Sequence, residues 1–124
     1  MHRSISVIAM LAVVAVAGCT SAGSGPSASV PPGADVIVAK DYKFDTATLA
    51  MTAGDSTLIH FTNLDSEQHD IAIFPNKDSS DAMFDGENIA RGSIVYDVPA
   101  FDAGTYYFKC TIHPIMFGDV QVTP

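Results

Sequence analysis

Short runs in which apolar and polar residues alternate recur from residue 34 to the end of the chain. Because the side chains of a β-strand point alternately to opposite faces, such runs predict half-buried strands. The predicted strands are Asp35–Phe44, Thr57–Thr62, Thr105–Cys110 and Phe117–Thr123. The alternation is strictest in the last of these, where Gly118, Val120 and Val122 share a face.

Turn-forming clusters separate these runs, and no stretch after residue 33 has a long helical period. The clusters are Ala53-Gly54-Asp55, Asn63-Leu64-Asp65, Pro75-Asn76 and Asp102-Ala103-Gly104. Between them, Ser79–Gly86 is expected to hold a short turn. Several short strands at this spacing predict an all-β fold over residues 34–124, a Greek-key β-sandwich or barrel.

The period of two also assigns side chains to faces. The residues expected to share one face of the first strand are Val36, Val38, Tyr42 and Phe44. In the second strand, Ile59 and Phe61 are expected to share a face. We expect these apolar faces to supply part of the core.

Two side chains with metal-binding chemistry fall on inward faces. His69 opens its predicted strand on the face of Ile71 and Ile73, and Cys110 closes its own strand facing inward. Met116 opens the last strand. If the Cys110 strand runs antiparallel to its neighbours, these three residues meet at one end of the barrel.

The first 33 residues differ from the rest of the chain. Residues 1–18 form a predicted signal peptide, with an apolar run too short for the about 20 residues that span a membrane. Small residues lead directly to Cys19, as in bacterial lipoproteins, so we predict that Cys19 is lipidated. An ordinary cleaved signal with a free or disulfide-bonded Cys19 is the alternative. Residues 19–33 are rich in Ser, Ala, Gly and Pro, which predicts a flexible lipid-anchored linker.

The charge balance excludes one class of partner. The chain has six Lys and Arg against fourteen Asp and Glu, and loss of residues 1–18 removes only Arg3, so the formal net charge becomes −9. Nucleic-acid-binding proteins instead concentrate Lys and Arg on the binding face. We therefore expect no nucleic-acid partner. The signal predicts an exported protein, anchored at the outer face of the cytoplasmic membrane or in the periplasm, and we expect a monomer.

The segment Cys-x₂-His-x₂-Met carries three possible metal ligands, Cys110, His113 and Met116, within seven residues. His69 supplies a second imidazole from a distant strand. Two imidazoles, a thiolate and a weak thioether suit copper, and this set is typical of electron-transfer copper centres. Zinc also accepts Cys and His but gains little from a thioether. Each residue alone is most often a core residue, so the joint pattern carries the prediction of one copper ion per chain.

These ligands lie in a longer frame that resembles the cupredoxins, the small blue copper proteins. The frame runs from Phe101 to Gly118 as Phe-x-Ala-Gly-Thr-Tyr-Tyr-Phe-x-Cys-x₂-His-Pro-x-Met-x-Gly. The short ligand loop is most similar to that of amicyanin, because plastocyanin and pseudoazurin have a longer His-to-Met spacing. The resemblance covers residues 35–123 and implies a Greek-key sandwich.

The resemblance also implies a function and a role for each ligand. Copper would cycle between Cu(I) and Cu(II) and transfer single electrons between larger redox proteins. His69, Cys110 and His113 would be the strong equatorial ligands, and Met116 the weak axial one. The chain departs from its relatives at Asp70, where they usually have Asn. A carboxylate only accepts hydrogen bonds, so we expect Asp70 to accept from Thr111 and its charge to favour Cu(II).

We interpret the chain as an electron carrier and not an enzyme, with a dehydrogenase, a cytochrome or an oxidase as its redox partner. The expected electron port is His113 with its neighbours Pro114 and Ile115, because an exposed apolar patch often marks a contact surface. One alternative is a copper-binding module that sequesters or delivers copper. Another is a redox enzyme with an open coordination position.

The remaining polar side chains are assigned to the surface. His60 is expected on the exposed face of its strand, and Glu67 in a solvated loop rather than as an oxygen ligand. A group of acidic residues is predicted to form a solvated loop, with steering of a cationic partner as the alternative. The members of this group are Asp78, Asp81, Asp85 and Glu87.

Overall fold

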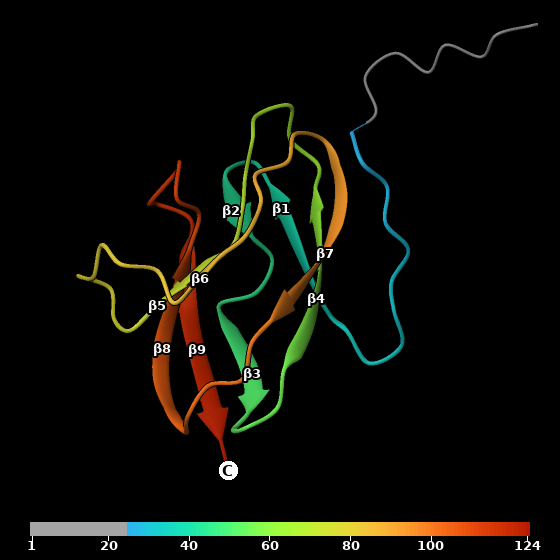
Figure 1. Cartoon of the computed structure of the whole chain (residues 1–124). Coiled ribbons are helices and arrows are strands. Elements are labelled where there is room, and N and C mark those ends of the chain that lie inside the picture. The colour runs from blue at the N-terminus through green and yellow to red at the C-terminus, as the bar shows by residue number, and fades with distance from the viewer. Residues whose placement is uncertain (1–24) are drawn as a thin grey trace, which may run out of the picture.

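The structure is a computed structural model that describes residues 25–124, in which nine strands form two facing sheets (Figure 1). One sheet has the order β2-β1-β4-β7 and the other the order β3-β9-β8-β5-β6. The strands are β1 Asp35–Lys40, β2 Lys43–Phe44, β3 Thr48–Thr52, β4 Thr57–Asn63, β5 Ala72–Phe74, β6 Phe84–Asp85, β7 Gly92–Val98, β8 Gly104–Lys109 and β9 Phe117–Thr123. The prediction of an all-β sandwich is confirmed. In this part of the chain there is no helix long and apolar enough to cross a membrane.

The pairing of β8 decides where the candidate ligands lie. β8 runs antiparallel to both β5 and β9. The loop after β8, which runs from Cys110 to Met116, therefore lies at the same end of the sandwich as the segment that leads into β5. We call this end the site pole and the opposite end the far pole. The turn between β1 and β2 also lies at the site pole (Figure 1).

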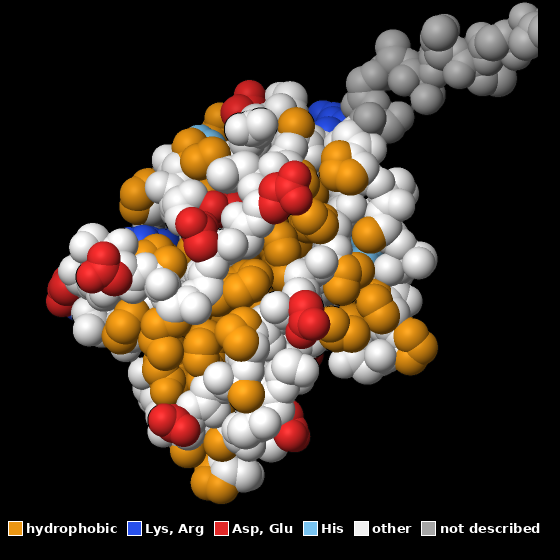
Figure 2. All heavy atoms as spheres, viewed as in Figure 1, with side chains coloured by type: hydrophobic (Ala, Val, Ile, Leu, Met, Phe, Trp, Pro, Cys, Tyr) orange, Lys and Arg blue, Asp and Glu red, His pale blue; other side chains and the backbone are white. Residues whose placement is uncertain are grey.

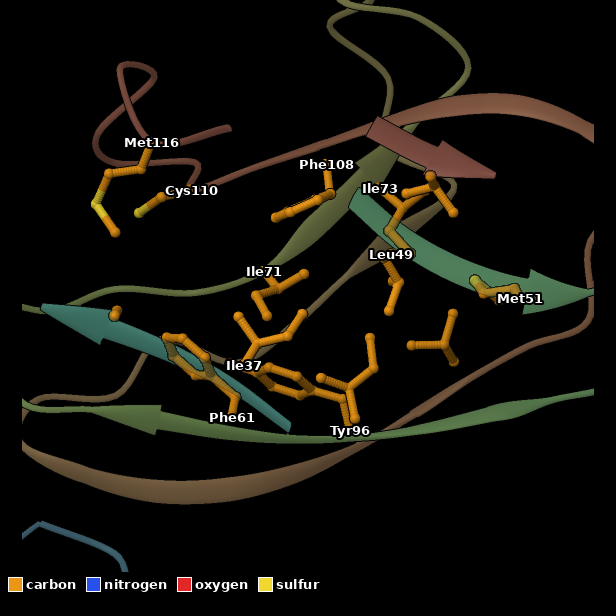
Figure 3. Close-up of a cluster of buried hydrophobic side chains, with 14 of the residues drawn as sticks. Ile37, Leu49, Met51, Phe61, Ile71, Ile73, Tyr96, Phe108, Cys110 and Met116 are labelled. Carbon is orange, nitrogen blue, oxygen red and sulfur yellow. The ribbon is translucent and has the colours of Figure 1, made fainter. Parts of the chain in front are cut away.

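The core fills the space between the two sheets (Figure 3). In β9 the small or apolar residues Gly118, Val120 and Val122 are buried and the intervening residues are exposed, as the alternation predicted. Ile59 and Phe61 are also both fully buried, as expected. Cys110 and Met116 extend the core to the site pole, so the candidate ligands are continuous with the packed interior.

The predicted strand Asp35–Phe44 is in fact two strands, and its expected face is wrong. Asp41 and Tyr42 have positive φ angles of 52° and 58° and form a two-residue hairpin turn between β1 and β2. The buried residues of β1 are Ile37 and Ala39, whereas Val36 is 50% exposed. The turn separates Tyr42 from the β1 faces and directs it to the site pole.

Three local expectations near other strands also need correction. His69 does not open β5, which begins at Ala72, but forms an isolated bridge with Ile89. Ser79–Gly86 ends in the short strand β6 rather than only a turn. His60 is not exposed on its strand surface: only 5% of it is accessible, because the backbone of Ala28 covers its ring. The last residues of the predicted linker thus lie against the domain.

Close packing at Gly118 gives a test of the fold. A Cβ atom there would lie 2.5 Å from the Phe108 ring and 2.6 Å from the Ala47 carbonyl oxygen. We expect Gly118→Ala to lower the free energy of unfolding by about 1–3 kcal/mol, because the strand must shift to admit the methyl group. Urea unfolding of the metal-free protein measures this change.

Gly104→Ala is the matched control, because the atoms nearest to its added Cβ would be 3.7 Å away, an ordinary contact. Its effect should stay within about 0.5 kcal/mol. Equal effects of the two substitutions would contradict the packing of β9 against β8.

Candidate metal centre

The loop Cys110–Met116 is closed by its own backbone. The N–H of Cys110 donates to the carbonyl oxygen of Met116 at 3.0 Å, and the N–H of Met116 donates to that of His113 at 2.9 Å. These bonds continue the β8–β9 hairpin, whose register pairs Lys109 with Phe117. A seven-residue loop tied in this way holds its three candidate ligands at defined positions.

The segment that carries His69 is fixed from the other side. His69 and Ile89 each donate a backbone N–H to the other's carbonyl oxygen, both at 3.0 Å. The fully buried Asn63 side chain donates to the carbonyl oxygens of Ile89 at 2.8 Å and Glu67 at 2.7 Å. An amide that satisfies buried backbone acceptors in this way stabilises an irregular segment that lies outside the sheet.

Asp70 joins these two segments. Its carboxylate is fully buried and accepts hydrogen bonds from both the backbone N–H of Thr111, at 2.7 Å, and the Thr111 hydroxyl. Asp70 follows His69 directly, and Thr111 follows Cys110 directly. The pair therefore sets the distance between the His69 and Cys110 side chains.

Three donor atoms converge at the site pole. His69 Nδ1 lies 3.1 Å from His113 Nδ1, and Cys110 Sγ lies 3.9 Å and 3.8 Å from these two nitrogens. The circle through the three atoms has a radius of about 2.1 Å, which matches metal bonds to His and Cys of about 2.0–2.3 Å. A metal ion at its centre would have trigonal coordination. The geometry and the chemistry of these donors therefore fit a copper ion.

The other ring nitrogen of His69 is held by a carboxylate. Nε2 lies 2.9 Å from Oδ2 of Asp65. Because a carboxylate accepts, Nε2 carries the proton, which leaves the lone pair of Nδ1 free to bind a metal. Burial by itself would raise the pKa of Asp65. Hydrogen bonds from the backbone N–H groups of Asp41 and Tyr42 and from the His69 ring outweigh this effect, so the pKa lies below its ordinary value of 3.8.

Tyr42 covers the two imidazoles. Its ring meets those of His69 and His113 edge-on, with centroids 5.5 Å and 5.0 Å apart. The strained turn that places it is held by Asp65, whose two oxygens accept from the N–H groups of Asp41 at 2.9 Å and Tyr42 at 3.1 Å. One carboxylate thus orients both a candidate ligand and its aromatic cover.

Cys110 and Met116 lie at the core side of the site. Cys110 is fully buried and Met116 is 1% exposed, and their side chains lie next to each other at one end of the core (Figure 3). Burial raises the pKa of the Cys110 thiol, against the effect of the backbone N–H groups of Asp70, His113 and Ile112. A cation among the donors would favour the thiolate form.

Comparisons with known proteins find copper proteins of similar sequence and fold. Amicyanin from Paracoccus versutus is 29% identical over 129 residues, which cover 98% of this chain and 95% of the relative. Its crystal structure covers 82% of this chain and 93% of the relative, with a TM-score of 0.60 and 29% identity. A solved Cu(I) form of an amicyanin variant has the same TM-score at 27% identity, with 82% and 94% covered. The chain is thus similar in sequence and in fold to the cupredoxins, the blue copper proteins.

Two further results complete the comparison. Auracyanin from Roseiflexus castenholzii has a TM-score of 0.64 at 19% identity over 74% of this chain and 98% of the relative, which supports the fold alone. No family model matches the sequence.

The structure places the other predicted site residues as follows. In the Cys110–Met116 loop, His113 is half-buried, Pro114 is exposed and Ile115 is 74% exposed. Glu67 is exposed and accepts from the Ser66 hydroxyl, away from the donor triangle. The acidic group from Asp78 to Glu87 is exposed at each of its four members. Cys19 and residues 1–18 lie outside the described residues.

Sequence reasoning missed Tyr42 and Asp65. Tyr42 was placed on a strand face and Asp65 only in a turn cluster. An acid four residues before a candidate His ligand was a usable signal, but Glu67 is equally acidic and closer in sequence. Only the fold shows that Asp65 faces the imidazole.

Replacement of Asp65 tests the role of its carboxylate. Asp65→Asn should lower the free energy of unfolding of the metal-free protein by about 1–3 kcal/mol at neutral pH. Both carboxylate oxygens of Asp65 accept hydrogen bonds, whereas the amide nitrogen of Asn cannot accept one. The folded pKa of Asp65 is below the unfolded one, so its stabilisation is present above pH 3.8 and is lost as the pH falls through the folded pKa. Urea unfolding over this pH range should show the two proteins converging.

Asp55→Asn is the control, because Asp55 is exposed and its side chain makes no hydrogen bond within residues 25–124. It should leave the unfolding free energy nearly unchanged. A constant difference between wild type and Asp65→Asn down to the lowest pH would show that the Asp65 charge does not carry the effect.

Proposed function

We propose that this chain carries single electrons with one copper ion held by His69, Cys110 and His113, with Met116 as a weak fourth ligand. The observation that supports it best is the convergence of two imidazole nitrogens and one thiol sulfur on a common centre. The solved Cu(I) form of an amicyanin variant supports copper as the metal. Copper supplies one-electron redox chemistry at such a site.

The protein's own contribution is to keep the ligands still. Electron exchange is fast when ligands move little between oxidation states, so a rigid surround favours a carrier. The backbone closure of the Cys110–Met116 loop, the Asp70–Thr111 pair and the Asp65 carboxylate each restrain one ligand-bearing segment. Such rigidity is less useful to a copper depot, which must release its metal, and this favours the carrier.

The electron port we propose is His113 with Pro114 and Ile115. Apolar side chains around this loop are unusually exposed: Ile115 by 74%, Phe117 by 55% and Ile112 by 47%. Phe117 stacks on Tyr107 rather than entering the core. An apolar surface rimmed by polar residues fits a redox protein partner. The acidic side chains spread over the face seen in Figure 2 would favour a partner with basic residues around its own port.

We propose that the chain works outside the cytoplasm, as the signal peptide of residues 1–18 predicts. Cys19 would carry the lipid anchor, residues 19–33 would link it to the domain, and residues 34–124 would bind copper as a monomer.

Copper loading of the full chain tests the metal site. A Cu(II)–thiolate bond absorbs strongly in the visible, so the wild type should become intensely coloured. Cys110→Ser should abolish the colour and keep the fold, because the hydroxyl is a poor soft ligand. The control His60→Gln, which alters an imidazole outside the donor triangle, should keep the colour. A colourless copper-bound wild type would contradict the blue-copper proposal.

Electron self-exchange tests the port. Ile115→Lys should leave the visible spectrum nearly unchanged but slow self-exchange by an order of magnitude or more. In self-exchange two copies meet port to port, so the two added ammonium groups repel each other, and about 2 kcal/mol of repulsion is enough for this loss of rate. Val36→Lys adds the same charge at a residue that is 50% exposed on β1, and it should exchange like wild type.

Two results would change the proposal. If Ile115→Lys exchanges as fast as Val36→Lys, the port lies elsewhere on the surface. If the coloured wild type itself exchanges negligibly, copper sequestration or delivery becomes the better function.

A further inference from the structure

The first described residues lie along the edge of the sandwich. The N–H of Gly25 donates to the Arg91 carbonyl oxygen at 2.6 Å, and the N–H of Ala28 donates to that of Ser93 at 3.1 Å. In return the N–H of Ser93 donates to the Pro26 carbonyl oxygen at 2.6 Å. Residues 25–28, which we call the docked segment, therefore extend the sheet beyond β7 in a parallel direction.

Polar side chains and two glycines allow the docked segment to approach β7 closely. The Ser93 hydroxyl contacts both the N–H and the carbonyl oxygen of Ala28, at 3.1 Å and 3.2 Å, and His60 Nε2 lies 3.0 Å from the same carbonyl oxygen. A Cβ on Gly25 would lie 2.0 Å from the Arg91 carbonyl oxygen, and one on Gly92 only 2.2 Å from that of Pro26. The close approach requires glycine at both positions.

The docked segment changes the pole at which the chain leaves the domain. β1 ends at the turn that Asp65 holds beside His69, so β1 begins near the far pole. Without docking, the residues before Ala34 would therefore leave from the far pole. The blue segment in Figure 1 instead runs back along the outside of β4 and β7 toward the site pole.

The first residue of the docked segment is connected to the segment that carries His69. Gly25 bonds to Arg91, which is two residues from Ile89, the bridge partner of His69. Gly92, next to Arg91, is paired with Asn63, whose side chain holds the His69 segment. Gly25 thus lies at the site pole, on the side of β7.

We propose that the docked segment holds the site pole toward the membrane, so that the exposed apolar port meets a redox protein embedded in that membrane. This proposal rests on two parts of the proposed function, the lipid anchor at Cys19 and the copper site. From Cys19 to Gly25 there are six residues, which span at most about 20 Å when fully extended. A lipid on Cys19 would therefore keep Gly25, and with it the site pole, within about 20 Å of the bilayer surface.

The charge of the chain favours an embedded protein over lipid as the occupant of the port. The predicted mature chain carries a formal net charge of −9, which gains no attraction from anionic headgroups. The apolar side chains of Ile112, Ile115 and Phe117 still need a complementary surface. A partner whose own port stands at the membrane–water boundary provides that surface within the reach of the tether.

The test uses full-length, lipidated, Cu(II)-loaded protein on vesicles of zwitterionic lipid that contain a small fraction of nitroxide-labelled lipid. Cu(II) enhances the relaxation of nearby nitroxides, so the enhancement reports how close the site pole lies to the label. We expect strong enhancement for headgroup labels and several-fold weaker enhancement for labels in the middle of the acyl chains.

Gly25→Val should undock the segment, because its side chain would clash with the Arg91 carbonyl oxygen. We expect faster hydrogen exchange at the Ala28 amide and a several-fold loss of headgroup enhancement. Ser29→Val places the same side chain at the exposed residue that follows the docked segment. Within residues 25–124 the Ser29 side chain makes no hydrogen bond, so this variant should behave like wild type.

The outcomes separate this proposal from those on which it rests. A colourless protein contradicts the copper site, and colour without vesicle flotation contradicts the lipid anchor. With both present, equal headgroup enhancement in wild type and an undocked Gly25→Val would overturn the role of docking. Strong enhancement of mid-chain labels would show that the port inserts into lipid, which would overturn the embedded protein as its occupant.

Discussion

The hydrogen bonds between Asp70 and Thr111 are the constraint on which the site depends. They connect two segments that belong to distant parts of the sequence, and each segment carries a candidate ligand at the adjacent position. A buried carboxylate is costly unless donors satisfy it, so loss of this pairing would cost far more than its formation contributes. The sandwich therefore favours one arrangement of His69 relative to Cys110, before any metal is bound.

The Asp65 carboxylate makes a second constraint at the solvent side of the site. Left-handed backbone at two successive residues that are not glycine costs about 1–3 kcal/mol each. At Asp41 and Tyr42 this cost is offset by hydrogen bonds to Asp65, which also orients His69. The strained turn thus places an aromatic ring in edge-on contact with the two imidazoles.

The orientation of the domain is a separate property from the chemistry of the site. The candidate copper ligands lie on the loop after β8 and on the segment before β5, whereas the direction in which the chain leaves the domain depends on the edge of β7. Contacts of residues 25–28 with Arg91 and Ser93 bring these two properties to the same pole. For the tethered electron carrier proposed above, encounter with a membrane partner would then need little reorientation.

The sequence by itself determined the strand type, the inward faces of β4, β8 and β9, and a ligand set whose chemistry suits copper. These features are local, since they follow from a period of two and from donor spacing within a few residues. Only the tertiary structure decided that Asp65 and not Glu67 faces His69, that Tyr42 covers the imidazoles and that His60 lies beneath Ala28. Each of these depends on a left-handed turn or a parallel edge contact between segments far apart in the chain, and hydrophobic periodicity carries no information about either.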